Sequence, residues 1–203
     1  MKKILFGIMV IALVACTVKF GATINFSDLI SDTNKTVIAD LRVSVPSCSD
    51  ENVQNIQAEL EKRNIRANFN KCSSDELWND YASFSFPITI VKESDTPDSD
   101  IYFQYKDNNF YIKTSNRFAT LLNTGDDMFA DKISISGIEF YLVNDTNDAI
   151  NLKTYLAFVD EKPVYDKTVE VKSYNKVLIK LPDVVSKLME NSAAEYMIFS
   201  LEK

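Results

Sequence analysis

The N-terminal segment constrains this chain most, because it decides which part of the chain folds and in which compartment. Lys2 and Lys3 form a positively charged start, and an apolar run of ten residues (ILFGIMVIAL) follows from Ile4 to Leu13. Small residues and Cys16 come next. This arrangement is typical of a secretory signal peptide. The run is too short to cross a bilayer, which takes about 20 apolar residues. Because the segment has the pattern of a signal peptide, we expect the rest of the chain to be exported.

The end of this segment, Leu13-Val14-Ala15-Cys16, resembles the lipobox of bacterial lipoproteins. The resemblance covers residues 1–16 only. It implies that Cys16 receives a diacylglyceryl group, that a signal peptidase cleaves before it, and that a further acyl chain such as palmitate is added. Two or three acyl chains anchor a protein firmly, because each buried methylene contributes about 0.8 kcal/mol. The alternative is an ordinary secreted protein that is cleaved after Ala15.

The same resemblance bears on localisation. In Gram-negative lipoproteins an Asp directly after the lipidated Cys favours retention in the inner membrane, whereas this chain has Thr17 there. We therefore expect a lipid-anchored protein of the cell envelope, at the outer membrane if the cell is Gram-negative. We predict a signal peptide over residues 1–15 and a lipidated tether over residues 16–35.

Two cysteines remain once Cys16 is assigned to lipid. An even pair, Cys48 and Cys72, in an exported chain predicts a disulfide. Closing a loop of about 25 residues would stabilise the fold by roughly 3 kcal/mol in the chain-entropy model. Redox chemistry or metal binding is the alternative. The chain has no Cys-x-x-Cys and no His, so we favour the structural disulfide.

The hydrophobic pattern predicts an α+β fold. Apolar residues alternate over 36–45 and again over 65–69, which is typical of half-buried strands. Between them, Val53, Ile56 and Leu60 lie on one face of a predicted helix over 50–64. Cys48 precedes this helix and Cys72 follows the second strand. The disulfide would therefore clip a β-α-β unit.

The remainder of the chain is predicted to be rich in strands. Residues 101–106 and 109–114 form a predicted hairpin around Asp107-Asn108. Further strands are predicted over 133–144, 151–159, 164–172, 177–181 and 195–201, with a late helix over 184–191. We expect an α+β region over 36–124 and a mainly antiparallel sheet or small sandwich over 125–203.

Few residues have the pattern of a catalytic or metal site. The absence of His excludes Ser-His-Asp and Cys-His arrangements and most zinc sites. Ser173 and Lys176 have a Ser-x-x-Lys spacing, but they fall in a predicted turn. The acidic turn over 145–148 lacks the Gly and the Glu of a calcium loop. We therefore predict no catalytic, cofactor-binding or metal-binding residues, and no enzyme.

The net charge and the positions of the aromatic residues argue against several classes of ligand. Removing Lys2 and Lys3 takes the net charge from −7 to −9, which argues against nucleic-acid binding and against direct adhesion to anionic lipid headgroups. Aromatic residues concentrate over 102–111, where alternation favours a core role over a sugar-binding or protein-binding face.

The leading hypothesis is a non-enzymatic, lipid-anchored envelope protein that binds a protein partner or shields the surface. Its small size and single anchor are compatible with a phage or mobile-element origin. The alternative is a lipoprotein that binds a small ligand or a glycan.

Overall fold

The computed structural model describes residues 17–62, 66–74, 80–92, 97, 99, 101–116 and 134–202. The strands before residue 117 are β1 (Thr17–Asn25), β2 (Lys35–Val45), β3 (Asn68–Ser74), β4 (Asp80–Lys92), β5 (Ile101–Lys106) and β6 (Asn109–Thr114). The later strands are β7 (Ser134–Val143), β8 (Ile150–Val159), β9 (Lys162–Val171), β10 (Lys176–Leu181) and β11 (Ala194–Glu202). The helices are α1 (Phe26–Ile30), α2 (Asp50–Lys62) and α4 (Asp183–Asn191).

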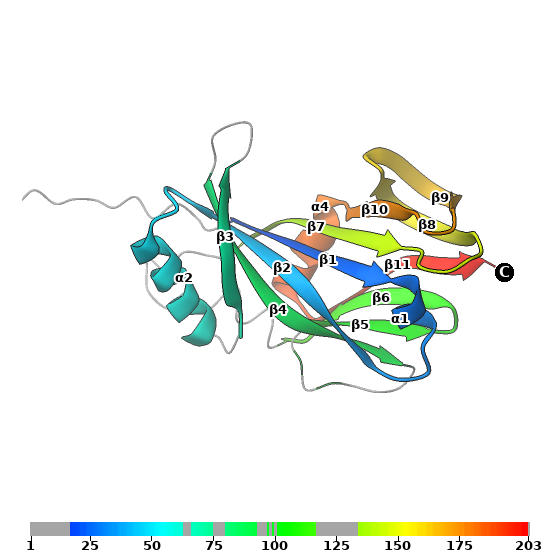
Figure 1. Ribbon diagram of the computed structural model, residues 1–203, viewed down its shortest axis with the longest axis horizontal. Coiled ribbons are helices and arrows are strands. Elements are labelled where there is room, and N and C mark those ends of the chain that lie inside the picture. The colour runs from blue at the N-terminus through cyan, green and yellow to red at the C-terminus, as the bar shows by residue number, and fades with distance from the viewer. Residues whose placement is uncertain are drawn as a thin grey trace, which may run out of the picture.

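Nine of these strands close into a barrel (Figure 1). Their order is β10-β7-β1-β2-β4-β5-β6-β11-β8, and the end of β8 pairs back onto β10. Two further strands pair with the ring from outside it, β3 with β4 and β9 with β8. In Figure 1, β3 and α2 lie at the end of the barrel where β1 begins, and the C-terminus lies at the other end.

Aromatic side chains fill the barrel. Phe20, Phe103 and Phe140 come from three different strands and pack with ring centroids 5.3–6.4 Å apart. Phe110 and Phe199 extend this group, with their rings 5.1 Å apart. All five side chains are buried. Fully burying each one contributes about 1.5–3 kcal/mol, so the interior is the main source of stability.

The predicted α+β architecture is wrong. β2, α2 and β3 do follow one another, but β2 and β3 do not pair, because β4 lies between them and is antiparallel to both. The later strands do not form a sheet of their own either, since β7 pairs with β1 and β11 pairs with β6. Alternation identifies the buried face of a strand but does not identify the strand beside it.

Strands from both sides of the predicted boundary near residue 124 share one sheet and one hydrophobic core. The boundary itself lies outside the described residues.

The segment predicted as a tether belongs largely to the barrel. Over Thr17–Asn25 every second side chain is buried, with Val18, Phe20, Ala22 and Ile24 facing the core. Residues 26–30 then form α1. Polar residues between the apolar ones give this stretch the average composition of a linker, although its alternation is that of a strand. The predicted signal peptide and the predicted lipidation residue, Cys16, lie outside the described residues.

Two local predictions are confirmed. β5 and β6 form the predicted hairpin, and its turn residues Asp107 and Asn108 have φ values of 51° and 62°. Both angles lie in the left-handed region that a tight hairpin turn requires. Cys48 and Cys72 form the predicted disulfide, with their Cα atoms 5.9 Å apart. The bridge ties the connection between β2 and α2 to β3.

Candidate functional site

The outer surface of β1, β2, β4 and β3 carries a pocket of about 280 Å3, which we call the basic pocket. Its lining residues are Lys19, Arg42, Lys71, Ser73, Ser74, Tyr81 and Ser83. None of these residues is acidic, although the chain as a whole carries a net charge of −7. The pocket is therefore a local concentration of positive charge on an acidic protein.

Strand register brings the three cations together. Lys19 lies opposite Arg42, Arg42 lies opposite Ser83, and Ser83 lies opposite Lys71. These four residues form one row across four adjacent strands. Neighbouring strands lie about 4.8 Å apart, so the row spans roughly 14 Å. Ser83 is buried and forms the floor between the basic side chains.

A β-bulge in β3 places Lys71 in this row. The register with β4 shifts between Phe69 and Lys71, which leaves Asn70 as the extra residue. The Asn70 side chain accepts a hydrogen bond of 3.0 Å from the Ser85 hydroxyl of β4. A bulge turns the following side chains to the other face of the strand. Lys71 therefore lies opposite Ser83 and on the same face of the sheet. In a regular strand Asn70 would lie opposite Ser83 instead.

One of the three cations has a neighbouring aromatic side chain as a partner. The Lys19 ammonium lies 5.4 Å from the centroid of the Tyr81 ring, close enough for a cation–π interaction. The nearby carboxylate of Asp80 accepts a 2.6 Å hydrogen bond from the Ser74 hydroxyl. Arg42 and Lys71 form no ion pair with any carboxylate in the described part of the chain. Their charge is therefore available to an anionic ligand.

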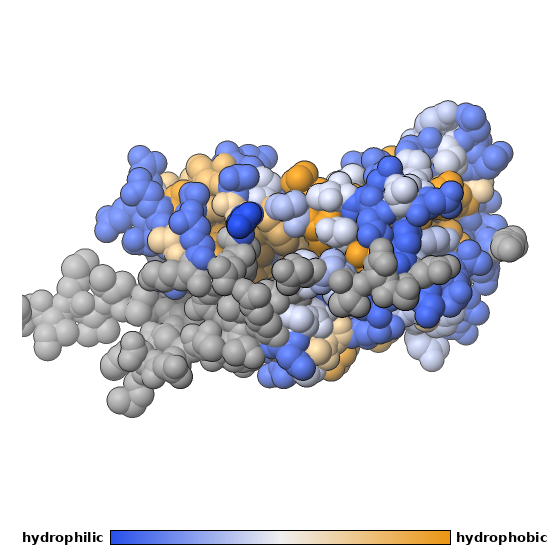
Figure 2. Space-filling view, turned by 90° about the horizontal axis from the view of Figure 1, so that it is seen from below, coloured by the Kyte–Doolittle hydropathy of each residue, from blue (hydrophilic) through white to orange (hydrophobic). Residues whose placement is uncertain are grey.

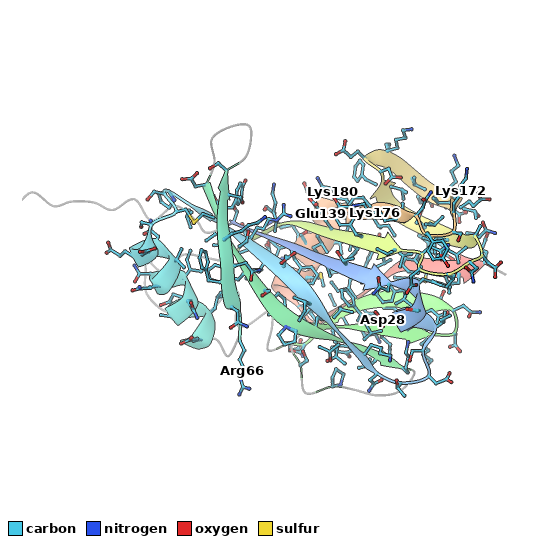
Figure 3. All side chains as sticks on the ribbon, in the orientation of Figure 1. Asp28, Arg66, Glu139, Lys172, Lys176 and Lys180 are labelled. Carbon is cyan, nitrogen blue, oxygen red and sulfur yellow. A yellow bond between two sulfur atoms is a disulfide. The ribbon has the colours of Figure 1, made fainter. Side chains whose placement is uncertain are left out.

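A second basic group differs from this pocket. Figure 3 labels Lys176 and Lys180 of β10, and Lys172, which directly follows β9. Lys180 lies opposite Glu139, with 3.9 Å between the ammonium and carboxylate atoms. The Lys176 ammonium lies 4.9 Å from the centroid of the Tyr141 ring. Lys180 is thus paired with a carboxylate, unlike Arg42 and Lys71, so we do not treat this group as a site.

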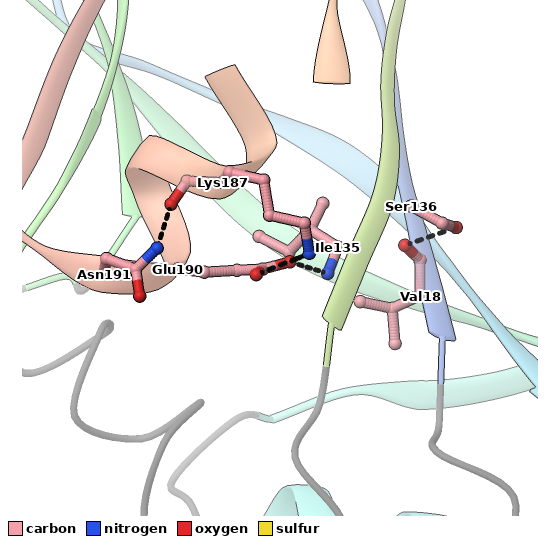
Figure 4. Close-up of polar contacts among 6 residues, drawn as sticks. All are labelled: Val18, Ile135, Ser136, Lys187, Glu190 and Asn191. Atoms are coloured by element: carbon pink, nitrogen blue, oxygen red, sulfur yellow. Dashed lines mark hydrogen bonds and ion pairs between the residues drawn. The ribbon is translucent and has the colours of Figure 1, made fainter. Parts of the chain in front are cut away.

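Glu190 is a buried carboxylate, but its contacts are structural (Figure 4). It accepts hydrogen bonds from the backbone N–H of Ile135 at 2.5 Å and from the Lys187 ammonium at 2.8 Å. Nearby, the Ser136 hydroxyl donates to the carbonyl of Val18 at 3.1 Å. Together these contacts fix the end of α4 to the starts of β7 and β1.

The Ser-x-x-Lys spacing does not form a dyad. The Ser173 hydroxyl donates a 2.7 Å hydrogen bond to the carbonyl of Thr146, and the Lys176 ammonium lies over the Tyr141 ring. Each side chain thus has its own partner.

The acidic turn over 145–148 is explained by hydrogen bonds. Asp145 accepts from both the backbone N–H and the hydroxyl of Ser27, at 2.9 and 2.5 Å. Desolvation, the largest single effect, raises the pKa of Asp145, but these hydrogen bonds and one to its own backbone outweigh it, so the pKa is lowered. No group of three or more His, Cys, Asp or Glu side chains within the described ranges is placed to hold a metal.

The basic pocket was not predicted from the sequence. Its residues come from four strands, and only the register brings them together. The available signal was that Lys19 and Arg42 occupy outward positions in two alternating segments. Lys71 gave no such signal, because the bulge at Asn70 interrupts the alternation of β3.

Comparison with known proteins identifies a family for this chain. A family model described as a domain of unknown function (DUF7424) matches residues 18–203, which include nearly all of β1 and every later strand. No curated protein and no solved structure matches the chain. No helix in the described ranges is long and apolar enough to span a membrane. The chain belongs to the family of the DUF7424 domain, whose function is unknown.

Proposed function

We propose that this protein is a non-enzymatic, lipid-anchored protein of the bacterial cell envelope that binds another envelope protein. The lipobox resemblance at Leu13-Val14-Ala15-Cys16 supports the anchor. The observation that carries the binding role is an exposed apolar surface on the β8–β9 hairpin. Blocking access to an envelope receptor, as a phage-encoded lipoprotein would do, is one form of this role.

The apolar surface is contiguous. Leu156, Phe158 and Tyr165 are 44%, 38% and 78% exposed. Leu156 lies opposite Tyr165 across the hairpin, and Phe158 lies opposite Pro163. We call these four residues the hairpin face. Single exposed apolar residues are ordinary on protein surfaces, whereas adjacent ones are typical of interaction sites.

The edge of this hairpin favours contact through side chains. Among the described strands, β9 pairs only with β8. Pro163 lacks a backbone N–H, and Asp166 has a φ of 46° and an ion pair of 3.1 Å with Lys153. Pro, charged side chains and local irregularity are the features that protect an edge strand from adding a further strand. A partner would therefore contact the side chains of the hairpin face.

The filled barrel also favours a macromolecular partner. Phe20, Phe103 and Phe140 occupy the interior, so recognition falls to the outer surface. On the side shown in Figure 2, hydrophobic residues form separate patches between hydrophilic ones. Aromatic side chains such as Tyr165 are enriched where two proteins meet.

Site-specific photo-crosslinking in the native envelope tests the binding role. The full chain carries a photoreactive amino acid at Tyr165, or at Ile38 on β2, which is 60% exposed and serves as the matched control. We expect one stoichiometric adduct from position 165 that disappears when Phe158→Asp is added, and no such adduct from position 38. Equal labelling from both positions, or none from 165, would contradict the proposed binding surface.

The basic pocket favours a second candidate, a lipoprotein that binds a small anionic ligand or an acidic glycan. This role predicts thermal stabilisation of the purified protein by the ligand without any protein partner. A stoichiometric protein adduct at the hairpin face with no stabilisation by anionic ligands would argue against it.

A further inference from the structure

We infer that the basic pocket binds the phosphate group of a membrane lipid headgroup. This inference rests on the proposed function, because it needs the lipid anchor at Cys16. It assigns to the pocket a ligand that is present wherever the anchor is inserted. It also gives the barrel a fixed orientation on the membrane.

The basic pocket lies close in sequence to the predicted anchor. Lys19 follows Cys16 by three residues, and β1 begins at Thr17. A chain spans at most about 3.6 Å per residue, so three residues keep Lys19 within a reach of about 11 Å from Cys16 whatever their conformation. The headgroup layer on each side of a bilayer is roughly 6 Å thick. An acylated Cys16 would therefore bring Lys19 to the depth of the phosphates.

The remaining lining residues lie at the same end of the molecule. Ser73 and Tyr81 face each other near the end of β3 and the start of β4. In Figure 1, the start of β1 lies at the end of the barrel that carries β3, and the C-terminus is at the far end. The pocket thus lies on the outer wall of the barrel near the end that an anchor at Cys16 would hold at the membrane, and the bulk of the chain extends away from that end.

The chemistry of the lining suits phosphate. The Arg42 guanidinium offers paired donors that match two phosphate oxygens, and the ammonium groups of Lys19 and Lys71 add charge. The hydroxyl groups of Ser73 and Ser83 can donate to the remaining oxygens. A volume of about 280 Å3 is at the small end for ligand pockets, so it fits a single headgroup.

The acidic net charge is compatible with this site. A charge of −9 on the mature chain disfavours adhesion of the protein surface as a whole to anionic lipids. The basic pocket is a local exception next to the anchor. The acidic remainder would be repelled by an anionic leaflet, which reinforces an orientation with the pocket toward the membrane.

Lysine labelling in lipid nanodiscs tests the inference. The acylated protein is placed in nanodiscs of phosphatidylcholine alone or with added phosphatidylglycerol, and the reactivity of each lysine with an amine reagent is read by mass spectrometry. We expect the reactivity of Lys19 and Lys71 to fall by about tenfold when phosphatidylglycerol is present, the effect of one charge-assisted contact. Lys153 and Lys162 on the hairpin should not change.

Two variants of equal charge make the test specific. Arg42→Gln should remove most of the protection of Lys19, because it deletes the bidentate donor beside it. Lys180→Gln removes the same charge from β10 and should leave the protection intact. Equal effects of the two variants would show a general electrostatic attraction and would overturn the pocket assignment.

The remaining outcomes separate the possible failures. Unchanged reactivity of Lys19 and Lys71 with phosphatidylglycerol overturns the inference. If millimolar inorganic phosphate protects the two lysines in phosphatidylcholine discs and phosphatidylglycerol does not, the pocket binds free phosphate. That result overturns the inference that the phosphate group belongs to a lipid. The same spectra report the Cys16 peptide. An unacylated Cys16 would defeat the proposed function, whereas an acylated Cys16 with unprotected lysines would defeat only the pocket inference.

Discussion

At the residue scale, one buried amide orders the acidic turn between β7 and β8. The Asn144 side chain is inaccessible to solvent and donates to the carbonyls of Asp148 and Val171, at 2.8 and 2.9 Å. Its oxygen accepts from the backbone N–H and the hydroxyl of Thr146. All of its hydrogen-bonding capacity is used, so the turn does not need a cation to hold its shape.

Asn144→Asp tests this account of the turn. A carboxylate cannot donate, so the two carbonyls would lose their donors and face a negative charge. We expect the free energy of unfolding at pH 7 to fall by about 3 kcal/mol. Asn147→Asp is the control, because Asn147 only accepts a hydrogen bond, from the Tyr174 hydroxyl, which a carboxylate can also do. Equal stability of the two variants in urea unfolding would contradict the prediction.

At the element scale, Glu190 joins α4 to β7. Its carboxylate is 1% exposed and holds both the N–H of Ile135 and the Lys187 ammonium. A buried charge of this kind is costly to leave without partners, and so is the backbone group that it satisfies. The contact therefore fixes the helix on the barrel wall.

Glu190→Ala should destabilise the protein by about 3 kcal/mol, because the N–H of Ile135 loses its acceptor and a cavity opens. Glu190→Gln keeps an acceptor for that N–H and should cost clearly less. Thermal and urea unfolding of both variants provide the measurement. The structural role would be refuted if the two substitutions cost the same, or if neither moved the unfolding midpoint.

The disulfide connects elements that lie outside the nine-stranded barrel. Cys48 precedes α2 and Cys72 lies in β3, 24 residues later. We expect the Cys48→Ala/Cys72→Ala double variant to lose about 3 kcal/mol of stability in urea, because the unfolded chain loses a constraint. The wild-type protein in reducing agent should match it. An unchanged midpoint in either sample would show that the bridge adds no stability.

The sequence correctly predicted the elements that depend on residues close together in the chain. Asp107 and Asn108 tolerate the left-handed turn conformation, so the β5–β6 hairpin was correctly placed. The partners of β1 could not be predicted. Ser134 pairs with Thr17 across more than a hundred residues, and no local feature of either strand specifies the other. The basic pocket was missed for the same reason, since it depends on the register of β1, β2, β3 and β4.

At the scale of the whole molecule, the barrel closes only when both halves of the chain contribute. β1 lies between β2 and β7, and β6 lies between β5 and β11. In the interior, Phe140 from the second half packs on Phe20 and Phe103 from the first. Neither half can therefore bury its own apolar face.

A chain truncated after residue 124 tests this interdependence. It keeps β1 to β6 but loses the partners of two wall strands and Phe140. We expect no cooperative thermal transition in circular dichroism and no fixed aromatic environment in the near-ultraviolet spectrum. The control is the full chain cleaved at a protease site inserted at residue 124, whose two pieces should stay together. Cooperative unfolding of the fragment near the midpoint of the full chain would contradict a shared core.

The N-terminal peptide of the protein extracted from bacterial membranes gives the most direct test of the central claim, that an acylated Cys16 joins the barrel directly to the membrane. Mass spectrometry should find a peptide that begins at Cys16 and carries a diacylglyceryl group. In that peptide Thr17, the first residue of β1, comes directly after the acylated Cys16. A peptide that begins at Met1, or one that begins at Cys16 with a free thiol, would contradict the account.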